Sequence, residues 1–580
     1  MLSAMANKAV KREAASVSWR PTVAGSHYAV SSGHYLATAA AMRVLDAGGN
    51  AVDAGVTAAM ALTVLQPDVV SFAGVVPTLI YLKEEGKVIS LAGLGYWPAD
   101  TDVARLRAAG GKSVPEGILR QVIPAAPATH VEALRRFGTL SFEQAVTPAY
   151  QLARDGFCVY PELRDSIEIH GKEIDRYAEN AAIFRPLGRT PAVGERLRQA
   201  SLARTLERLV EAERKASGDR AAKLRAVHDC FYKGSIADDI AAYHRRHGGF
   251  MTRDDLAGFE VPVEPSLSIR YRGFEIHSCD VWCQGHVLLQ TLKTLEGLDL
   301  EALGWNSVRY LHTLCEAMSL AFSDREAYVG DPKFIKVPTR ELLSAEYAAR
   351  QRARIDANKA FGRMPDPGLG GFSRELTSSK GEVPVPADTI YCCVADKHGN
   401  AFSATPSDTM YDTPMVEGLG FAPSARGTQG RLEPGHPLFV EPGKRPRLTP
   451  NPALALRDGE FAMAWGTPGG DVQCASMLQV FLNATQWGLS MQQAIEAPRV
   501  APFSFPNSFA PNAYFPGRLC VENRFPEETI AALEKLGHDV EIWPEKSWSM
   551  GSVCAILRDP STGLLHAGAD PRRPGYALAW

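Results

Sequence analysis

Residues 383–400 read VPVPADTIYCCVADKHGN, and this stretch decides the fold. Its prolines favour extended backbone in front of Thr389, and apolar, β-prone residues follow the threonine. Residues 396–400 have the composition of a tight turn. The stretch therefore predicts a strand that starts at Thr389 and a hairpin after it.

Thr389 lies deep in the chain, yet its surroundings resemble a new N-terminus. A threonine hydroxyl is a poor nucleophile unless a base lies beside it. Cleavage of the Asp388–Thr389 bond would place a free α-amine there, with a reference pKa of roughly 7.7–8.0, suited to act as a general base. The alternative is that Thr389 is an ordinary strand residue.

Several short blocks follow one another on both sides of Thr389. They are SSGHYLA at 31–37, LDAGGNAVDA at 45–54, PAYQLARDGF at 148–157, Glu316-Ala317-Met318, Asp324-Arg325, Gly330-Asp331-Pro332, GKRP at 443–446, TPGGD at 467–471 and ADPR at 569–572. Through these blocks the chain resembles the γ-glutamyltranspeptidase family of N-terminal-nucleophile hydrolases over most of its length. The resemblance implies a precursor that is cut at the Asp388–Thr389 bond by Thr389 itself.

The resemblance also implies the fold and the domain organisation. The expected fold is α+β, a four-layer αββα sandwich of the N-terminal-nucleophile hydrolase type. Residues 1–388 would form a large segment and residues 389–580 a small segment of one shared domain. Residues up to about 26 are expected to be a loose leader, and the stretch of about 362–388, rich in Gly, Pro and Ser, a processing linker.

Local patterns predict the elements around these blocks. Residues 38–65 predict two helices separated at Gly48-Gly49, and residues 79–92 predict a hairpin. Further helices are expected at 141–155, 201–225, 306–328, 477–487 and 491–497, and strands at 268–279, 390–395, 401–405, 453–457 and 461–466.

Gly469 and Gly470 are candidates for an oxyanion hole. They follow a predicted strand and precede an apolar helical stretch, and such a loop can direct backbone N–H groups at a developing negative charge. The alternative is a tight structural turn. The resemblance implies the catalytic role, because the Pro-Gly-Gly loop of the family forms the oxyanion hole.

Thr405 and Ser407 lie on the return strand of the hairpin. Alternate residues share one face of a strand, so both hydroxyls can be directed back towards Thr389. The resemblance implies that Ser407 contacts the nucleophile; the alternative is a surface serine in a turn. Asn400 either completes its own turn or, as the family block implies, lies near the active site.

The residues that would recognise a glutamyl group are altered. Residues 91–98 contain no arginine where the family has one before an Ala-Pro. Leu448-Thr449 stands in place of the family's Ser-Ser pair, Thr428 in place of its aspartate, and residues 73–77 in place of its glycine-rich run. Because discrimination of a charged substrate depends on such partners, we expect a different substrate. The candidate substrate-binding residues are Arg426, Thr428, Thr449 and Asn400, with Arg426 as the cation for a carboxylate or carbonyl. Tyr96, Trp97 and Phe421 are either pocket walls or core.

The composition excludes several classes of protein. The chain has 580 residues, 45% of them hydrophobic and 22% charged, with a net charge of −3, which fits neither a nucleic-acid-binding nor a membrane-binding surface. Ten scattered cysteines give neither a zinc motif nor a disulfide framework, so no metal and no organic cofactor are expected. Residues 1–19 lack an apolar signal region, so a cytoplasmic location is expected.

Three functions follow from the sequence. The first is a self-processing threonine amidohydrolase for a non-glutamyl, small-molecule amide, whose large and small segments stay together. The second is a true γ-glutamyl transferase with other substrate anchors. The third is a non-catalytic binding protein that is never cut. Asp570 and Arg572 are expected to form a structural ion pair, and a homodimer is compatible with the sequence.

Overall fold

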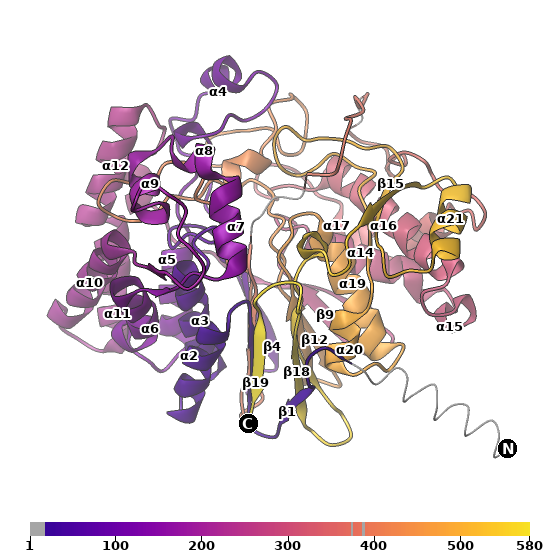
Figure 1. The fold of residues 1–580 in the computed structure, drawn as a ribbon, viewed down its shortest axis with the longest axis horizontal. Coiled ribbons are helices and arrows are strands. Elements are labelled where there is room, and N and C mark those ends of the chain that lie inside the picture. Colours follow the sequence, from indigo (N-terminus) through magenta and orange to yellow (C-terminus); the bar gives the residue numbers. More distant parts are fainter. Residues whose placement is uncertain (1–17, 373–374, 385–388) are drawn as a thin grey trace.

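The computed structural model describes residues 18–372, 375–384 and 389–580. Two seven-stranded sheets lie face to face in the middle of the molecule, and helices cover both outer faces (Figure 1). This is the four-layer αββα sandwich that the sequence predicts, and the prediction is confirmed.

Both large sheets are antiparallel throughout. The first sheet has the order β1 (Val23–Gly25), β18 (Leu565–Ala569), β17 (Cys554–Arg558), β13 (Glu460–Gly466), β12 (Ala453–Arg457), β9 (Phe274–Ser278) and β8 (Leu267–Tyr271). The second sheet has the order β19 (Tyr576–Ala579), β2 (Ala29–Ser32), β10 (Cys392–Ala395), β11 (Ala401–Ala404), β3 (Thr78–Leu82), β4 (Lys87–Leu91) and β7 (Val263–Pro265). Two smaller sheets contain β14 (Val500–Pro502), β15 (Arg518–Glu522) and β16 (Asp539–Trp543), and β5 (Phe157–Cys158) and β6 (Arg196–Leu197).

The helices fall into two groups that flank the sheets (Figure 1). On the side of the second sheet are α2 (Tyr35–Asp46), α3 (Ala51–Leu65), α4 (Val103–Gly110), α5 (Ala126–Phe137), α6 (Phe142–Asp155), α7 (Pro161–Ile169), α8 (Gly171–Ile174), α9 (Ala178–Phe184), α10 (Ala200–Lys215), α11 (Arg220–Tyr232), α12 (Ser235–His247) and α13 (Arg253–Ala257). On the side of the first sheet are α14 (Gly285–Glu296), α15 (Leu300–Leu303), α16 (Val308–Tyr328), α17 (Thr339–Leu342), α18 (Ala345–Arg352), α19 (Val472–Thr485), α20 (Met491–Glu496) and α21 (Glu527–Lys535). Short 3-10 turns are η1 (Ile118–Arg120), η2 (Arg426–Gln429) and η3 (Trp548–Met550). Among the described residues, we find no helix with the length and apolar character needed to cross a bilayer.

The four layers enclose three hydrophobic cores, one at each interface. The first lies between the second sheet and its helices, the second between the first sheet and its helices, and the third between the two sheets. Strand alternation divides neighbouring residues among them, since Cys392 belongs to the helix-side core and Cys393 to the inter-sheet core. Both cysteines are buried free thiols.

The two segments on either side of Thr389 are interleaved in both sheets. In the second sheet, β10 pairs with β2 on one side and with β11 on the other, and β11 pairs with β3. In the first sheet, β12 pairs with β9, and β1 pairs with β18. A cut before Thr389 would therefore leave two pieces held together by backbone ladders.

Most predicted elements are present, with three differences. Residues 201–225 form two helices rather than one, because Asp219 caps a new helix at Ala222 N. Residues 268–279 form the hairpin β8–β9, which turns at Arg272 and Gly273, both with positive φ. The expected leader is too long, because Val23–Gly25 form β1.

The predicted leader and the predicted processing linker lie partly outside the residues that the structure describes. Residues 1–17 of the leader lie outside them. So does Asp388, together with the linker residues 385–387. The described part of the linker, 362–372 and 375–384, contains no helix and no strand, in agreement with the prediction of a loop.

Candidate active site

Thr389 lies directly in front of β10, in the interior of the molecule, and is 0% exposed. Its N–H donates to Val69 O at 3.0 Å, and the next N–H, of Ile390, donates to Pro406 O at 3.0 Å. The φ angle of Thr389 is 72°, in the left-handed region that a β-branched residue rarely adopts. Strain of this kind is found at functional sites, where the surrounding structure holds it in place.

Ser407 supplies the hydroxyl that contacts Thr389. The two side-chain oxygens, Thr389 Oγ1 and Ser407 Oγ, are 2.5 Å apart. A pair of backbone hydrogen bonds with Val75 fixes Ser407, at 2.9 Å for Ser407 N to Val75 O and 3.3 Å for the reverse. Gly74 permits this close approach, because a Cβ at that position would lie 2.3 Å from Ser407 O.

Arg426 lies behind Ser407 in the same buried cluster. Its Nη2 donates to Ser407 Oγ, and its Nε is 3.5 Å from Asp408 Oδ1. Asp408 in turn accepts from Ala425 N at 3.0 Å, which fixes the start of η2. A guanidinium only donates, so the Ser407 oxygen is the acceptor and its own hydrogen can be directed at Thr389. The arrangement places a positive charge one hydroxyl away from the threonine oxygen.

Thr405 directly follows the return strand β11, and its hydroxyl makes no hydrogen bond to Thr389. Its hydroxyl is buried and has no hydrogen-bond partner among the described residues, whereas its N–H donates to Pro77 O at 3.1 Å. Of the two hydroxyls predicted on this strand, the structure therefore brings only that of Ser407 to the threonine.

Gly469 and Gly470 form the turn between β13 and α19. Their φ angles are 116° and 58°, which favour glycine at both positions. Neither amide N–H donates to any residue that the structure describes. The turn also stands at the N-terminus of α19, where the helix dipole favours negative charge. Locally, the turn has the features that an oxyanion hole requires.

A bridge of glutamine and threonine side chains links this turn to the Arg426 cluster. Gln284 Nε2 donates to both Gly470 O and Thr449 O at 3.0 Å. The Thr449 hydroxyl accepts from Gln429 Nε2 at 2.9 Å, and Gln429 ends the turn η2 that Arg426 begins. Of the predicted substrate-binding residues, Arg426 and Thr449 thus belong to one hydrogen-bonded framework. Thr428 lies in the same turn, and its carbonyl accepts from Ala510 N at 3.1 Å.

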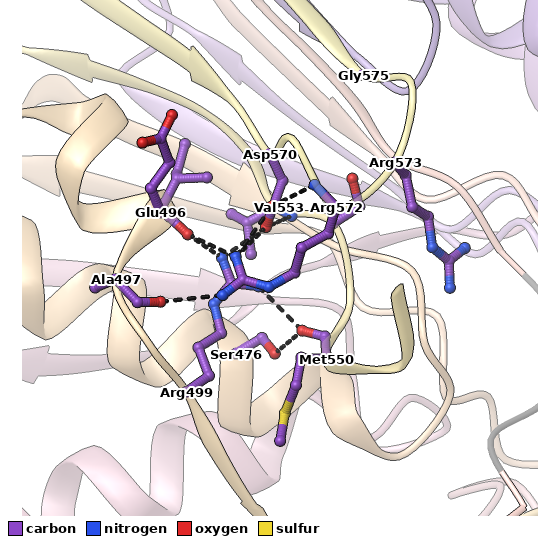
Figure 2. Close-up of polar contacts among 12 residues, drawn as sticks. Ser476, Glu496, Ala497, Arg499, Met550, Val553, Asp570, Arg572, Arg573 and Gly575 are labelled. Carbon is purple, nitrogen blue, oxygen red and sulfur yellow. Dashed lines mark hydrogen bonds and ion pairs between the residues drawn. The ribbon is translucent and has the colours of Figure 1, made fainter. Parts of the chain in front are cut away.

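A buried ion network holds the segment that packs against the glycine turn, and Figure 2 shows its contacts around Asp570. Asp570 pairs with Arg572 at 3.0 Å, as predicted, and also with Arg499 at 2.7 Å. Burial alone would raise the pKa of Asp570, but the two guanidinium groups hold it below its usual range. Arg499 also donates to Met550 O at 3.0 Å (Figure 2).

The segment that Arg499 holds packs against the glycine turn. Ser552 N donates to Thr467 Oγ1 at 2.7 Å. A Cβ on Gly469 would lie 3.5 Å from the Gly551 backbone. The network therefore has a structural role: it holds the segment that contacts the glycine turn.

The structure does not bring Asn400 to the site. Asn400 lies in the β10–β11 turn, where it accepts from Lys83 N at 3.0 Å and donates to Asp396 at 3.0 Å. Thr389 is at the other end of β10, about 20 Å away at roughly 3.3 Å per strand residue. The prediction that Asn400 lies near the nucleophile is wrong, because its side chain completes the local turn.

The aromatic residues considered as pocket walls are core residues. Trp97 is 1% exposed and packs in a small cluster against η2, and Phe421 is 0% exposed among the helices. Tyr96 is half-buried against Phe259, with ring centroids 5.8 Å apart. Leu448 belongs to the inter-sheet core.

Sequence reasoning missed three residues beside Thr389. Val69 O receives the N–H groups of both Thr389 and Asp408, at 3.0 and 3.2 Å. Its neighbour Asp68 is buried, and burial raises the pKa of that carboxyl from 3.8 to about 6. A lone acidic residue inside the apolar run 64–76 was the available signal for Asp68. A main-chain carbonyl such as Val69 O leaves no such signal.

The sandwich, with a buried threonine before a central strand, is the fold of N-terminal-nucleophile hydrolases. The model of the Gamma-glutamyltranspeptidase family matches residues 37–580, and the chain belongs to this family.

Known relatives include both glutathione hydrolases and acylases. The chain is 31% identical to the glutathione hydrolase proenzyme of Escherichia coli K12, covering 92% of this chain and 89% of the relative. It is also 31% identical to the acylase ACY 1 proenzyme of Pseudomonas sp. SE83, covering 96% and 94%. The solved structure of a cephalosporin acylase from Bacillus halodurans superposes with a TM-score of 0.84 at 29% identity, covering 97% and 98%.

These similarities establish the enzyme class. The chain is an amide-bond hydrolase or acyltransferase of the γ-glutamyltranspeptidase family, and its relatives are made as proenzymes. The hypothesis of a non-catalytic binding protein is correspondingly disfavoured.

Proposed function

We propose that the protein is a self-processing amidohydrolase that uses Thr389 as its nucleophile and acts on a non-glutamyl amide. The observation that carries the proposal is the 2.5 Å contact between the hydroxyls of Thr389 and Ser407, with Arg426 behind it. It is supported by the strained backbone of Thr389, directly after the Asp388 peptide bond.

Processing would begin with attack of Thr389 Oγ1 on the Asp388 carbonyl carbon. The C–N bond breaks, the nitrogen takes the proton, and Asp388 is held as an ester on Thr389. This step frees the α-amine of Thr389, and water then hydrolyses the ester to release the Asp388 carboxylate and the Thr389 hydroxyl. Ser407, held by Arg426, supports the hydroxyl during this step by stabilising the negative charge on its oxygen.

The mature enzyme would use the same oxygen on its substrate. The α-amine takes the hydroxyl proton as the oxygen attacks the amide carbonyl, and the N–H groups of Gly469 and Gly470 stabilise the oxyanion. The ammonium then returns the proton to the leaving amine. Water resolves the acyl-enzyme on Thr389, or an amine does so in a transfer reaction.

The proposed specificity rests on the residues that replace the glutamate-binding set. Residues 91–98 lack the arginine that the family has there, and Thr428 stands in place of the family's aspartate. Leu448 lies between the sheets, and the Thr449 hydroxyl already accepts from Gln429. Because the identity to the glutathione hydrolase equals that to the acylase, overall similarity does not choose the substrate.

Gel electrophoresis and N-terminal sequencing test the processing. We expect pieces of 388 and 192 residues (580 − 388 = 192), and the smaller one should begin Thr-Ile-Tyr. Thr389→Ala should stay uncut and inactive, whereas Thr389→Ser should be cut slowly. An active, full-length wild-type chain would refute the proposal.

Kinetic comparison tests the substrate class. We expect kcat/KM for a γ-glutamyl anilide to be far below that for acyl amides without the α-ammonium and α-carboxylate, since each lost charged contact costs about 1.5–3 kcal/mol. The second candidate, a γ-glutamyl enzyme, is favoured by the glutathione hydrolase relative. A strong preference for the glutamyl anilide would establish that candidate instead.

A further inference from the structure

Three potential metal ligands converge away from the Thr389 cluster. His312 and Glu316 lie one turn apart on α16, and His538 lies just after α21. One ligand atom from each residue lies within 4.8 Å of the other two. All three side chains are buried, at 0%, 3% and 8% exposure. None of them contributes to the chemistry proposed above.

The hydrogen bonds of His312 direct a lone pair into this cluster. His312 Nε2 is 2.8 Å from Asp356 O, a carbonyl that can only accept, so Nε2 carries the hydrogen. The other ring nitrogen, Nδ1, is therefore a lone-pair donor in the neutral ring, and it lies 2.9 Å from His538 Nε2. Metal-bound histidines are commonly held in this way, with the second nitrogen donating to a carbonyl.

Glu316 adds a carboxylate without a cation. Its Oε2 accepts from Phe361 N at 2.7 Å, and no described residue donates to its other oxygen. No ion pair with a described Lys or Arg compensates the charge of this carboxylate. A bound cation would neutralise it.

We propose that His312, Glu316 and His538 bind one divalent first-row transition-metal ion of the Zn²⁺ class. Two imidazole nitrogens and one carboxylate oxygen match the ligands that Zn²⁺ takes, and they exclude Mg²⁺ and Ca²⁺, which prefer oxygen. A cavity of about 10 Å³ lined by Glu316 and His538 has room for roughly one water as a fourth ligand. At metal–ligand distances of about 2.0–2.1 Å, the ligand atoms need shifts that side-chain rotation supplies.

The ion would connect parts of the chain on both sides of Thr389. His312 and Glu316 belong to the large segment, and His538 belongs to the small one. The two backbone groups that hold the ligands, Asp356 O and Phe361 N, immediately precede the described linker. The site therefore acts as a structural clamp that joins the segments and anchors the start of the linker.

Metal binding by the full-length, untagged protein tests the proposal. Protein stripped with a chelator should bind one equivalent of Zn²⁺ by calorimetry and gain thermal stability on addition of Zn²⁺, but not of Mg²⁺. Co²⁺ should give a visible absorption spectrum of nitrogen and oxygen coordination. His538→Asn and Glu316→Gln should each weaken Zn²⁺ binding by at least about 100-fold, the upper end of the losses seen for the residues that merely support ligands.

His228→Gln is the matched control. His228 is also buried, and its ring nitrogens lie 3.1 Å from Asp229 and 3.8 Å from Glu260, but no second histidine faces it. Zn²⁺ binding should be unchanged in this variant. Glu316→Gln keeps the shape of the side chain, so it remains informative if His538→Asn does not fold. Absence of stoichiometric binding, or binding that both ligand variants retain, would overturn the proposal.

Discussion

At the scale of single residues, the surroundings of the Thr389 hydroxyl depend on the hydroxyl of Ser407. Ser407 lies between the threonine and Arg426, and its oxygen is the acceptor for the guanidinium. The cation therefore influences Thr389 Oγ1 through Ser407. A buried cation at this distance favours the form of the site in which negative charge develops on the threonine oxygen.

Ser407→Ala should lower both the processing rate and kcat by about 10–100-fold, the loss expected for a hydrogen bond to a developing charge. Thr405→Ala is the matched control, because it removes a nearby buried hydroxyl that makes no hydrogen bond to Thr389. Rates of precursor cleavage and single-turnover acylation measure both effects. Equal losses in the two variants would contradict the role assigned to Ser407.

Asp68 should make stability depend on pH. Its folded-state pKa is raised by burial to about 6 from 3.8, so its favourable contribution is complete below about pH 4 and is lost as the pH rises through 6. Asp68→Asn carries no such penalty. The stability of the variant relative to wild type should therefore rise by roughly 2–3 kcal/mol between pH 4 and pH 7.

Urea unfolding at several pH values measures this difference. Asp100→Asn is a suitable control, since Asp100 is exposed and the substitution should leave the pH dependence of stability unchanged. A pH-independent difference between Asp68→Asn and wild type would show that the carboxyl of Asp68 is ionised in the folded protein at no cost.

At the scale of elements, the β13–α19 turn is the part of the site that a change in backbone conformation should affect most. Gly469→Ala should reduce kcat by about 10²–10³-fold, the cost of one oxyanion donor. At a φ of 116°, alanine is strained, and its Cβ would lie 2.5 Å from Val472 Cγ1. The amide would therefore turn away from its present direction.

Gly459→Ala controls for strain alone. Gly459 lies at the other end of β13 with a φ of 75°, and its Cβ would meet nothing within 4 Å. This variant should lose stability by about 1 kcal/mol and keep its kcat. Circular dichroism and steady-state kinetics on both proteins separate the two effects. A normal kcat in Gly469→Ala would remove the turn from the mechanism.

At the scale of the whole molecule, the layers and most elements could be predicted from the sequence. The helix break at Gly48-Gly49 is an example. Asn50 and Asp53, which follow it, form a capping box, and their spacing is visible in the sequence. The Ser407 contact follows from the resemblance to the family, whereas strand alternation does not extend to it, because β11 ends at Ala404. The metal cluster could not be predicted, since His538 is distant in sequence from His312 and Glu316.

Other misses have equally specific causes. Asn400 belongs to a sequence block that resembles the family, yet the turn that it completes lies at the end of β10 opposite to Thr389. The hydrogen bonds to Val69 O and to the Asp408 carboxylate depend on which loops meet, and no local sequence pattern indicates that. The cytoplasmic location and the homodimer stay predictions.

The two cleaved pieces should remain together until the sheets unfold. Both sheets contain strands from either side of Thr389, so separation would break the ladders β1–β18, β9–β12, β19–β2, β2–β10 and β11–β3. Size-exclusion chromatography in increasing urea should show both pieces eluting together up to the unfolding transition seen by circular dichroism. Separation well below that transition would mean that the ladders contribute little.

The same interleaving has a consequence for the order of events during synthesis. The strands β12, β13, β17, β18 and β19 all follow Thr389 in the chain. Neither sheet is therefore complete when the ribosome has just made Thr389. If self-cleavage requires the assembled sheets, it would serve as a chemical record of assembly: an intact Asp388–Thr389 bond marks a misassembled copy, which a cell can distinguish from a working one.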